Sequence, residues 1–219
     1  MFYPVYLNLK GRLVVVIGGG EVAERKIESL LDSDASVLVI SPKVTPRIAS
    51  LSEQKMIEIQ YRSYIPGDCS GASLVFSATD NPKINRAVYQ EATTLGVFIN
   101  TADQPDRCSF IMPAVVRRGN IGVAISTNGT SPALAARLRR KISRVIGPEY
   151  ARLSELLSRI RPVIRSKVHT QEQRKDLHYR IIDSEIISLL KLDDRAPAER
   201  RLKEIIEDFM AETRENKMS

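Results

Sequence analysis

A short glycine-rich segment, GGGEVA at residues 18–23, has the residue types and spacing to bind a pyrophosphate. Gly18 permits a tight turn, Gly20 leaves room for a phosphate beside the backbone, and Ala23 lets a helix pack closely on a sheet. The segment follows an apolar run and precedes a helical pattern, so bound phosphates would lie at a helix N-terminus. This context favours dinucleotide binding over a tight turn in some other α/β fold.

Polar side chains also follow two later apolar runs. Thr79 and Asp80 come directly after one run, and Asp103 comes shortly after the next. Ligands of open α/β sheets bind at the carboxyl ends of strands, which makes Thr79 a candidate cofactor contact and Asp103 a candidate general base. A helix or turn cap is an equally good interpretation of Asp103, and a better one of Asp80 and Asp106.

A basic segment spans residues 113–146. It carries seven basic side chains and no acidic one, so the whole formal charge of +7 resides there. Four of the seven, Arg137, Arg140, Lys141 and Arg144, are spaced to share one stripe of a helix. A charge stripe is usually a solvated face, but the absence of acidic residues favours an anionic partner. A phosphate backbone and a small polyanion both remain open.

Two further features adjoin this stripe. Arg117 and Arg118 lie in a preceding hairpin pattern, and the loop STNGTSP at residues 126–132 leads into a helix N-terminus. There the backbone amides and the side chains of Thr127 and Asn128 can hold a carboxylate or a phosphate.

Other kinds of site are not indicated. Cys69 and Cys108 lack the spacing of a disulfide framework or a zinc site, and His169 and His178 share no obvious helical face, so we expect no metal site. No run approaches the roughly 18 apolar residues of a membrane span, and the first residues lack the pattern of a signal peptide. We therefore expect a soluble, cytoplasmic protein with no membrane partner.

The elements that would position these residues alternate along the first half of the chain. Short β-branched runs predict strands at residues 12–18, 36–41, 57–61, 73–78 and 97–100. Between the first two strands, Ala23, Ile27, Leu30 and Leu31 have the spacing of one buried helical face. Pro82 fits the first turn of another helix, which Gly96 ends. This alternation predicts an α/β fold with a Rossmann-like parallel sheet.

The pattern changes after residue 100. Residues 109–117 and 121–127 predict a β-hairpin, and Ser131-Pro132 predicts the start of a helix that Gly147-Pro148 ends. Three helical patterns follow. We thus expect a dinucleotide-binding domain at 1–112, a dimerisation and substrate-binding segment at 113–146, and a small helical domain at 147–219.

The residues at the end of the second predicted strand do not decide whether the cofactor is NAD or NADP. An acidic residue there would bind the ribose of NAD, but this chain has Ser41-Pro42-Lys43. Lys43 could instead favour the 2′-phosphate of NADP, and the dinucleotide prediction itself does not change.

Several long motifs in one order resemble the siroheme synthase dehydrogenase/ferrochelatase family. They are YPVYLNLKGRLVVVIGGGEVAERK, SATDNPKIN, INTADQPDRCSFIMPAVV and VAISTNGTSPALAARLRRKI, and the likeness covers about residues 2–146. The resemblance implies a homodimer that oxidises precorrin-2 to sirohydrochlorin with NAD, on the route to siroheme. Some members also insert ferrous iron into the product, so this chain's chelatase activity and its metal, iron or cobalt, stay open.

The resemblance also assigns roles to particular residues. Glu21, Val22, Pro42 and Lys43 match positions that contact NAD, and Asp103 matches an aspartate implicated in both activities. Thr127 stands where some relatives have a phosphorylated serine; threonine retains the hydroxyl, so phosphorylation stays open.

The basic segment and the resemblance agree, because a polycarboxylate tetrapyrrole requires cationic partners. Two other functions are weighed against it. One is an NAD(P)-dependent oxidoreductase acting on another acidic metabolite. The other is a dinucleotide-sensing or nucleic-acid-binding module, which the lack of aromatic residues among these arginines disfavours, so we expect no nucleic-acid partner.

Overall fold

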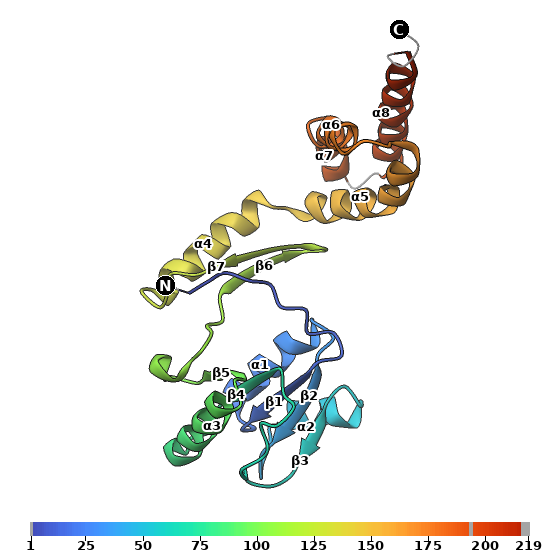
Figure 1. The fold of residues 1–219 in the computed structure, drawn as a ribbon. Helices are drawn as coiled ribbons and strands as arrows, with labels where there is room; N and C mark the ends of the chain where they lie inside the picture. Colours follow the sequence, from blue (N-terminus) through green and yellow to red (C-terminus); the bar gives the residue numbers. More distant parts are fainter. Residues whose placement is uncertain (1, 193–194, 216–219) are drawn as a thin grey trace. The chain divides into compact units, whose positions relative to one another are not determined.

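The computed structural model describes residues 2–192 and 195–215, and the chain divides into two compact units, Met1–Met112 and Pro113–Ser219 (Figure 1). Each unit has its own apolar core.

The first unit is built on a five-stranded parallel sheet. Its strands are β1 (Leu13–Ile17), β2 (Ser36–Ile40), β3 (Glu58–Gln60), β4 (Leu74–Ser77) and β5 (Phe98–Thr101). The spatial order is β3-β2-β1-β4-β5, so the direction of winding reverses between β1 and β4. Ligands of such sheets bind in the crevice at that reversal, beyond the carboxyl ends of the strands.

Helices cover both faces of this sheet (Figure 1). The unit contains α1 (Glu21–Leu31), α2 (Pro46–Glu53), α3 (Pro82–Thr94) and the short 3₁₀ helix η1 (Pro105–Arg107). Alternate residues of β1 point to opposite faces. Val14 and Val16 pack in one core with α1 and α2, while Val15 and Ile17 pack in the other with α3. The predicted Rossmann-like α/β fold is confirmed.

Local cap residues set the ends of the helices as the sequence predicts. Pro82 lies in the first turn of α3, and Gly96 follows that helix with a φ of +68°. The N-cap of α3 is Asn81, whose Oδ1 accepts hydrogen bonds from the amides of Lys83 and Ile84. The preference for Asp80 as a cap was therefore wrong, because the chain reaches the helix one residue later.

The second unit combines a hairpin with helices. Its elements are β6 (Ala114–Arg118), β7 (Ile121–Ile125), α4 (Pro132–Val145), α5 (Pro148–Lys167), α6 (Gln171–Ile182), α7 (Ile186–Lys191) and α8 (Arg195–Glu215). The two strands are antiparallel, and Ser131 caps α4 by accepting a hydrogen bond from the amide of Leu134. Helices α5 to α8 enclose an apolar core.

Three local expectations for this half differ from the structure. The first hairpin strand begins at Ala114 rather than 109, because Ser109 instead exchanges hydrogen bonds with Ile99. The second of the three predicted helical patterns divides into α6 and α7, where the Ser184 hydroxyl caps the break. The apolar spacing of Leu134, Leu138, Ile142 and Val145 predicts a buried face for α4, but Leu134 is 48% and Val145 72% exposed within this unit.

None of the helices described is long and apolar enough to span a membrane.

Candidate active site

The glycine loop between β1 and α1 packs tightly at the carboxyl edge of the sheet. Gly18 has a φ of +119°, and its amide donates to the carbonyl of Ile40 at 3.0 Å. A β-carbon at Gly18 would overlap the Ala78 carbonyl oxygen, and one at Gly19 would overlap the Lys43 carbonyl oxygen. The loop is therefore pressed between the ends of β2 and β4, where only glycine fits.

Gly20 differs from its two neighbours, because a β-carbon there would meet no atom within 4 Å. It is the N-cap of α1, and no side chain accepts a hydrogen bond there. The first amides of a helix have no partner within the helix, so they can bind an anion. The open space at Gly20 and these uncapped amides fit a pyrophosphate.

The first turn of α1 presents the other residues of the fingerprint. Ala23 is fully buried against the sheet, as close helix packing requires. Glu21 is exposed, and Val22 leaves 37% of its surface exposed beside the loop. These positions fit contacts to a cofactor lying over the helix N-terminus.

The end of β2 forms a second wall of the same edge. The buried Ser41 hydroxyl donates to the carbonyl of Lys43 at 2.6 Å, which curls the chain and leaves the side chains of Pro42 and Lys43 exposed. The Thr45 hydroxyl joins this turn to α1 by donating to the carboxylate of Glu24 at 2.5 Å. Lys43 thus offers an exposed ammonium at this wall.

The end of β4 is held by a buried amide that sequence reasoning missed. Asn85 accepts hydrogen bonds from Ser77 Oγ at 2.8 Å and Thr79 Oγ1 at 2.7 Å, and its Nδ2 donates to the Thr79 carbonyl. Thr79 is half-buried, and Asn85 fixes its hydroxyl. The signal in the sequence was the polar residue at a core-facing position of the predicted helix after Pro82.

Asp103 lies in the turn after β5, with a φ of +56° and an exposed side chain. The turn is closed by the Thr101 amide, which donates to Cys108 Sγ at 3.2 Å, and by the Thr101 hydroxyl, which donates to the Arg107 carbonyl at 2.9 Å. Gln104, and not Asp106, occupies the N-cap position of η1. An exposed carboxylate on a closed turn at this edge of the sheet can accept a proton from a ligand.

Lys26 is a further residue that sequence reasoning missed. Its Nζ donates to Asn100 Oδ1 at 2.8 Å and lies 5.0 Å from the ring centroid of Phe76. Burial lowers the pKa of Lys26, while the nearby Cys108 and Asp103 act in the opposite direction. A lysine among the apolar residues of α1 was the available signal in the sequence.

The basic candidates of the second unit differ in how far they are exposed. The side chains of Arg137, Arg140 and Lys141 are exposed along α4, and Arg117 is exposed on β6. Arg118 instead donates to the Ser143 hydroxyl at 2.7 Å and to the carbonyls of residues 143 and 146. Arg118 therefore fastens the hairpin to the end of α4.

The loop before α4 makes its own internal hydrogen bonds. Thr127 Oγ1 donates to the Ser131 carbonyl at 3.1 Å and accepts from the Ser131 amide at 3.2 Å. Asn128 is exposed in the left-handed region, with a φ of +50°. The Thr127 hydroxyl is thus engaged in the loop, whereas the Asn128 side chain faces solvent.

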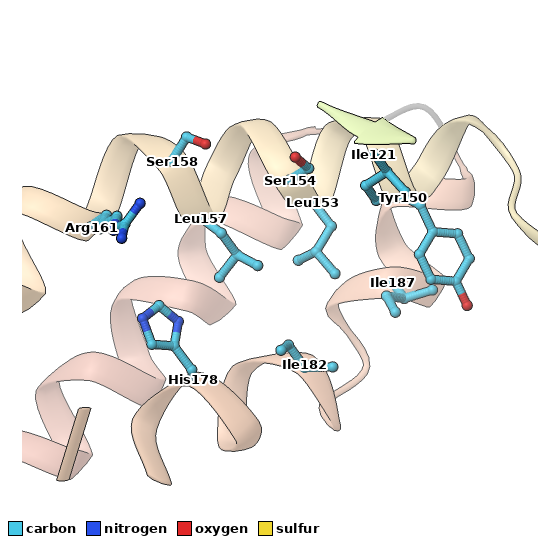
Figure 2. A pocket seen from close by; sticks show the side chains of 10 residues that line it. All are labelled: Ile121, Tyr150, Leu153, Ser154, Leu157, Ser158, Arg161, His178, Ile182 and Ile187. Carbon is cyan, nitrogen blue, oxygen red and sulfur yellow. The ribbon is translucent and has the colours of Figure 1, made fainter. Parts of the chain in front are cut away.

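The second unit also contains an open hollow of about 540 Å³. In Figure 2, Leu153 and Leu157 of α5 point toward His178 and Ile182 of α6. None of the predicted site residues lines it. Among the residues described, no cluster of histidine, cysteine and acidic side chains could hold a metal ion.

Comparison with protein families finds three consecutive matches. Residues 5–114 match a family described as "Putative NAD(P)-binding", residues 118–144 match "Sirohaem biosynthesis protein central", and residues 149–206 match "Sirohaem synthase dimerisation region". The first match alone spans half of the chain.

Individual relatives agree with these matches. Siroheme synthase of Methylobacillus flagellatus is 35% identical over 84% of this chain and 40% of its own length, and that of Nitrosomonas europaea is 35% identical over 94% and 44%. This chain thus spans less than half of these relatives. A solved structure named SirC, precorrin-2 dehydrogenase, matches with a TM-score of 0.77 and 25% identity, over 94% of this chain and all of that one.

Proposed function

The chain belongs to the sirohaem biosynthesis family, and we propose that it is an NAD-dependent dehydrogenase that oxidises precorrin-2 to sirohydrochlorin. The observation that carries the proposal is the match to SirC, precorrin-2 dehydrogenase, which extends over the whole of that chain. The siroheme synthases are more than twice as long as this chain, so the proposal takes from them only the dehydrogenase step.

The cofactor would be held by the carboxyl edge of the first unit's sheet. The residues proposed for this role are Gly18, Gly20, Glu21, Val22, Ala23, Pro42, Lys43 and Thr79. The uncapped amides of α1 and the open space at Gly20 support a pyrophosphate at that helix end. NAD, when bound, supplies the hydride acceptor. NADP is the alternative cofactor, because the ammonium of Lys43 could bind its 2′-phosphate.

Asp103 is proposed as the proton acceptor. Oxidation of precorrin-2 removes a hydride and a proton, and the carboxylate of Asp103 takes the proton. Its exposure supports this role, because a base must reach the atom that it deprotonates. Ferrous iron insertion also requires pyrrole protons to leave, so the same carboxylate would serve a chelatase activity if the chain has one.

The carboxylates of the substrate would bind the basic segment. Arg137, Arg140 and Lys141 on α4, with Asn128, present exposed donors for them, and Arg117 on β6 adds positive charge to the same segment. Thr127 and Arg118 would act less directly, because their donors are engaged in the loop and on α4. Within the second unit we propose a dimerisation and substrate-binding segment at 113–146, and a helical domain at 147–219.

The protein would act as a homodimer in the cytoplasm. The match of residues 149–206 to a dimerisation region supports the dimer, as do the exposed side chains of Leu134 and Val145 on α4.

Anaerobic incubation with precorrin-2 and NAD tests the proposal. We expect NADH and sirohydrochlorin to appear together in the absorption spectrum, and a second incubation with Fe²⁺ tests for siroheme. NAD reduction with another acidic metabolite, but not with precorrin-2, would support a different oxidoreductase. Steeply salt-dependent DNA or RNA binding without turnover would support a nucleic-acid module.

A further inference from the structure

We infer that Lys26 is a positioning residue, which acts through Asn100 to hold the turn that carries Asp103. The inference rests on the proposed function, because it assigns Asp103 the proton transfer of that reaction. It concerns the first unit alone.

Lys26 extends from α1 over the face of the sheet that α1 covers. Phe76 of β4 and Asn100 of β5 are direct neighbours in the sheet register. The Lys26 ammonium lies over the ring of Phe76 and donates to Asn100 Oδ1 at 2.8 Å. One cation thus connects α1 with the last two strands, close to the point where β5 ends.

Asn100 also forms hydrogen bonds with the segment that follows the turn, at residues 108–110. Only 9% of the residue is exposed, and its Nδ2 donates to the Phe110 carbonyl at 3.1 Å and to Cys108 Sγ at 3.6 Å. Because Lys26 can only donate, it keeps the amide oxygen turned toward itself and the NH₂ group turned toward residues 108–110. The amide therefore links α1 to both ends of the turn.

The turn between these anchors requires such support. Asp103 adopts the left-handed conformation, which costs most residues other than glycine free energy and which aspartate and asparagine tolerate better, so contacts around the turn help to keep it. Cys108, which follows Asp103, accepts hydrogen bonds at its Sγ from two groups that precede Asp103: the Thr101 amide at 3.2 Å and Asn100 Nδ2 at 3.6 Å. Loss of the Lys26 contact would free Asn100 to rotate and would loosen this closure.

The charge of Lys26 also acts on the turn. Among the residues described, no carboxylate forms an ion pair with it. The charged and titratable groups that influence it are Arg25 on its own helix and Cys108 and Asp103 on the turn. A half-buried cation is screened less than an exposed one, so Lys26 interacts with the turn more strongly than an exposed lysine would.

Substitution of Lys26 in the full chain separates this role from simple packing. Lys26→Met keeps much of the side-chain volume but removes the donor and the charge, and Lys26→Arg restores both. Arg25→Met is the matched control, because it removes a neighbouring, exposed cation of the same helix. For Lys26→Met we expect kcat to fall about tenfold or more, while the Kd for NAD changes by less than about twofold. Lys26→Arg should recover most of the loss, and Arg25→Met should behave like the parent.

A double-mutant cycle then tests whether Lys26 acts through Asp103. In an Asp103→Asn background, Lys26→Met should cause little further loss, because residues that act as a unit are not additive. Equal losses in both backgrounds, or an unchanged kcat in Lys26→Met, would overturn the inference.

Hydrogen–deuterium exchange gives a readout that does not depend on turnover. Amides of residues 101–110 should exchange faster in Lys26→Met than in Arg25→Met, whereas β1 should be unchanged. Unaltered exchange in this segment would overturn the positioning role even if the parent proved inactive on precorrin-2. If the parent proved inactive on precorrin-2 but residues 101–110 exchanged faster in Lys26→Met, the proposed function would be wrong. The conclusion that Lys26 stabilises the turn would still stand.

Discussion

The backbone of Gly18 lies so close to Ala78 that a β-carbon at Gly18 would overlap the Ala78 carbonyl oxygen. Gly18 also has a φ of +119°, which disfavours any residue with a side chain. We therefore expect Gly18→Ala to lower the free energy of unfolding by about 2–3 kcal/mol or more. Urea denaturation measures this loss, with Gly20→Ala as the control, since its β-carbon would meet open space.

Gly20 is expected to affect cofactor binding rather than the fold. Gly20→Val places a branched side chain where the pyrophosphate would approach the backbone, so NAD binding should be lost. The circular dichroism spectrum should stay close to that of the parent, because no neighbouring atom opposes the side chain. An unchanged Kd for NAD in calorimetric titration would disprove the assignment of the phosphate loop.

Asp103→Asn tests the proposed base. Asparagine tolerates the left-handed conformation and keeps the size of the side chain but cannot accept the proton, so NAD should still bind while turnover falls about 100-fold or more. Single-turnover oxidation of precorrin-2 measures the rate. Asp106→Asn, three residues later, is the matched control and should remain close to the parent. A rate within a few-fold of the parent would leave Asp103 as a turn residue only.

The basic stripe on α4 should bind substrate and not cofactor. Arg137→Ala or Arg140→Ala is expected to raise KM for precorrin-2 about tenfold, the loss of roughly one charge-assisted hydrogen bond, with KM for NAD little changed. Arg139→Ala, which removes an equal charge from a different side of the helix, is the control. Equal effects of all three substitutions would indicate a general field of positive charge instead.

Arg118 has a structural role that the exposed cations of α4 do not have. Its guanidinium donates hydrogen bonds to Ser143 in the last turn of α4 and to the carbonyl of Ile146 at the end of that helix. Arg118→Ala would therefore lower stability as well as change substrate binding.

Glu91 should give the first unit a pH-dependent part of its stability. Burial alone would raise the pKa of Glu91, but hydrogen bonds from the Tyr64 hydroxyl and from the amides of Cys69 and Gly67 outweigh it and lower the pKa. A carboxyl with a lowered folded-state pKa stabilises the protein above its unfolded-state pKa, and this contribution is lost as the pH falls through the folded-state pKa.

Glu91→Gln should therefore destabilise the protein by about 1–3 kcal/mol at neutral pH, and the difference from the parent should shrink in acid. Urea denaturation at several pH values measures it, with the exposed Glu53→Gln as the control. A constant difference at every pH would show that the charge of Glu91 contributes nothing.

Local sequence determined the elements and the outline of the cofactor site. The β-branched runs predicted all five parallel strands to within a residue or two, and Gly18, Pro82, Gly96 and Ser131 marked turns and helix ends. These features follow from backbone preferences over a few neighbouring residues, which a sequence displays directly. These preferences also predicted that Asp103 follows a strand, but they did not predict its left-handed backbone conformation.

The tertiary structure alone decided which polar groups meet. Lys26 and Asn100 are 74 residues apart, and their hydrogen bond exists only because α1 packs on the sheet in a position from which the Lys26 side chain reaches β5. Arg118 likewise belongs by sequence to the basic segment, but the packing of the hairpin turned its guanidinium inward to α4. Contacts of this kind depend on how elements pack over long separations, and no local pattern of residue types encodes that packing.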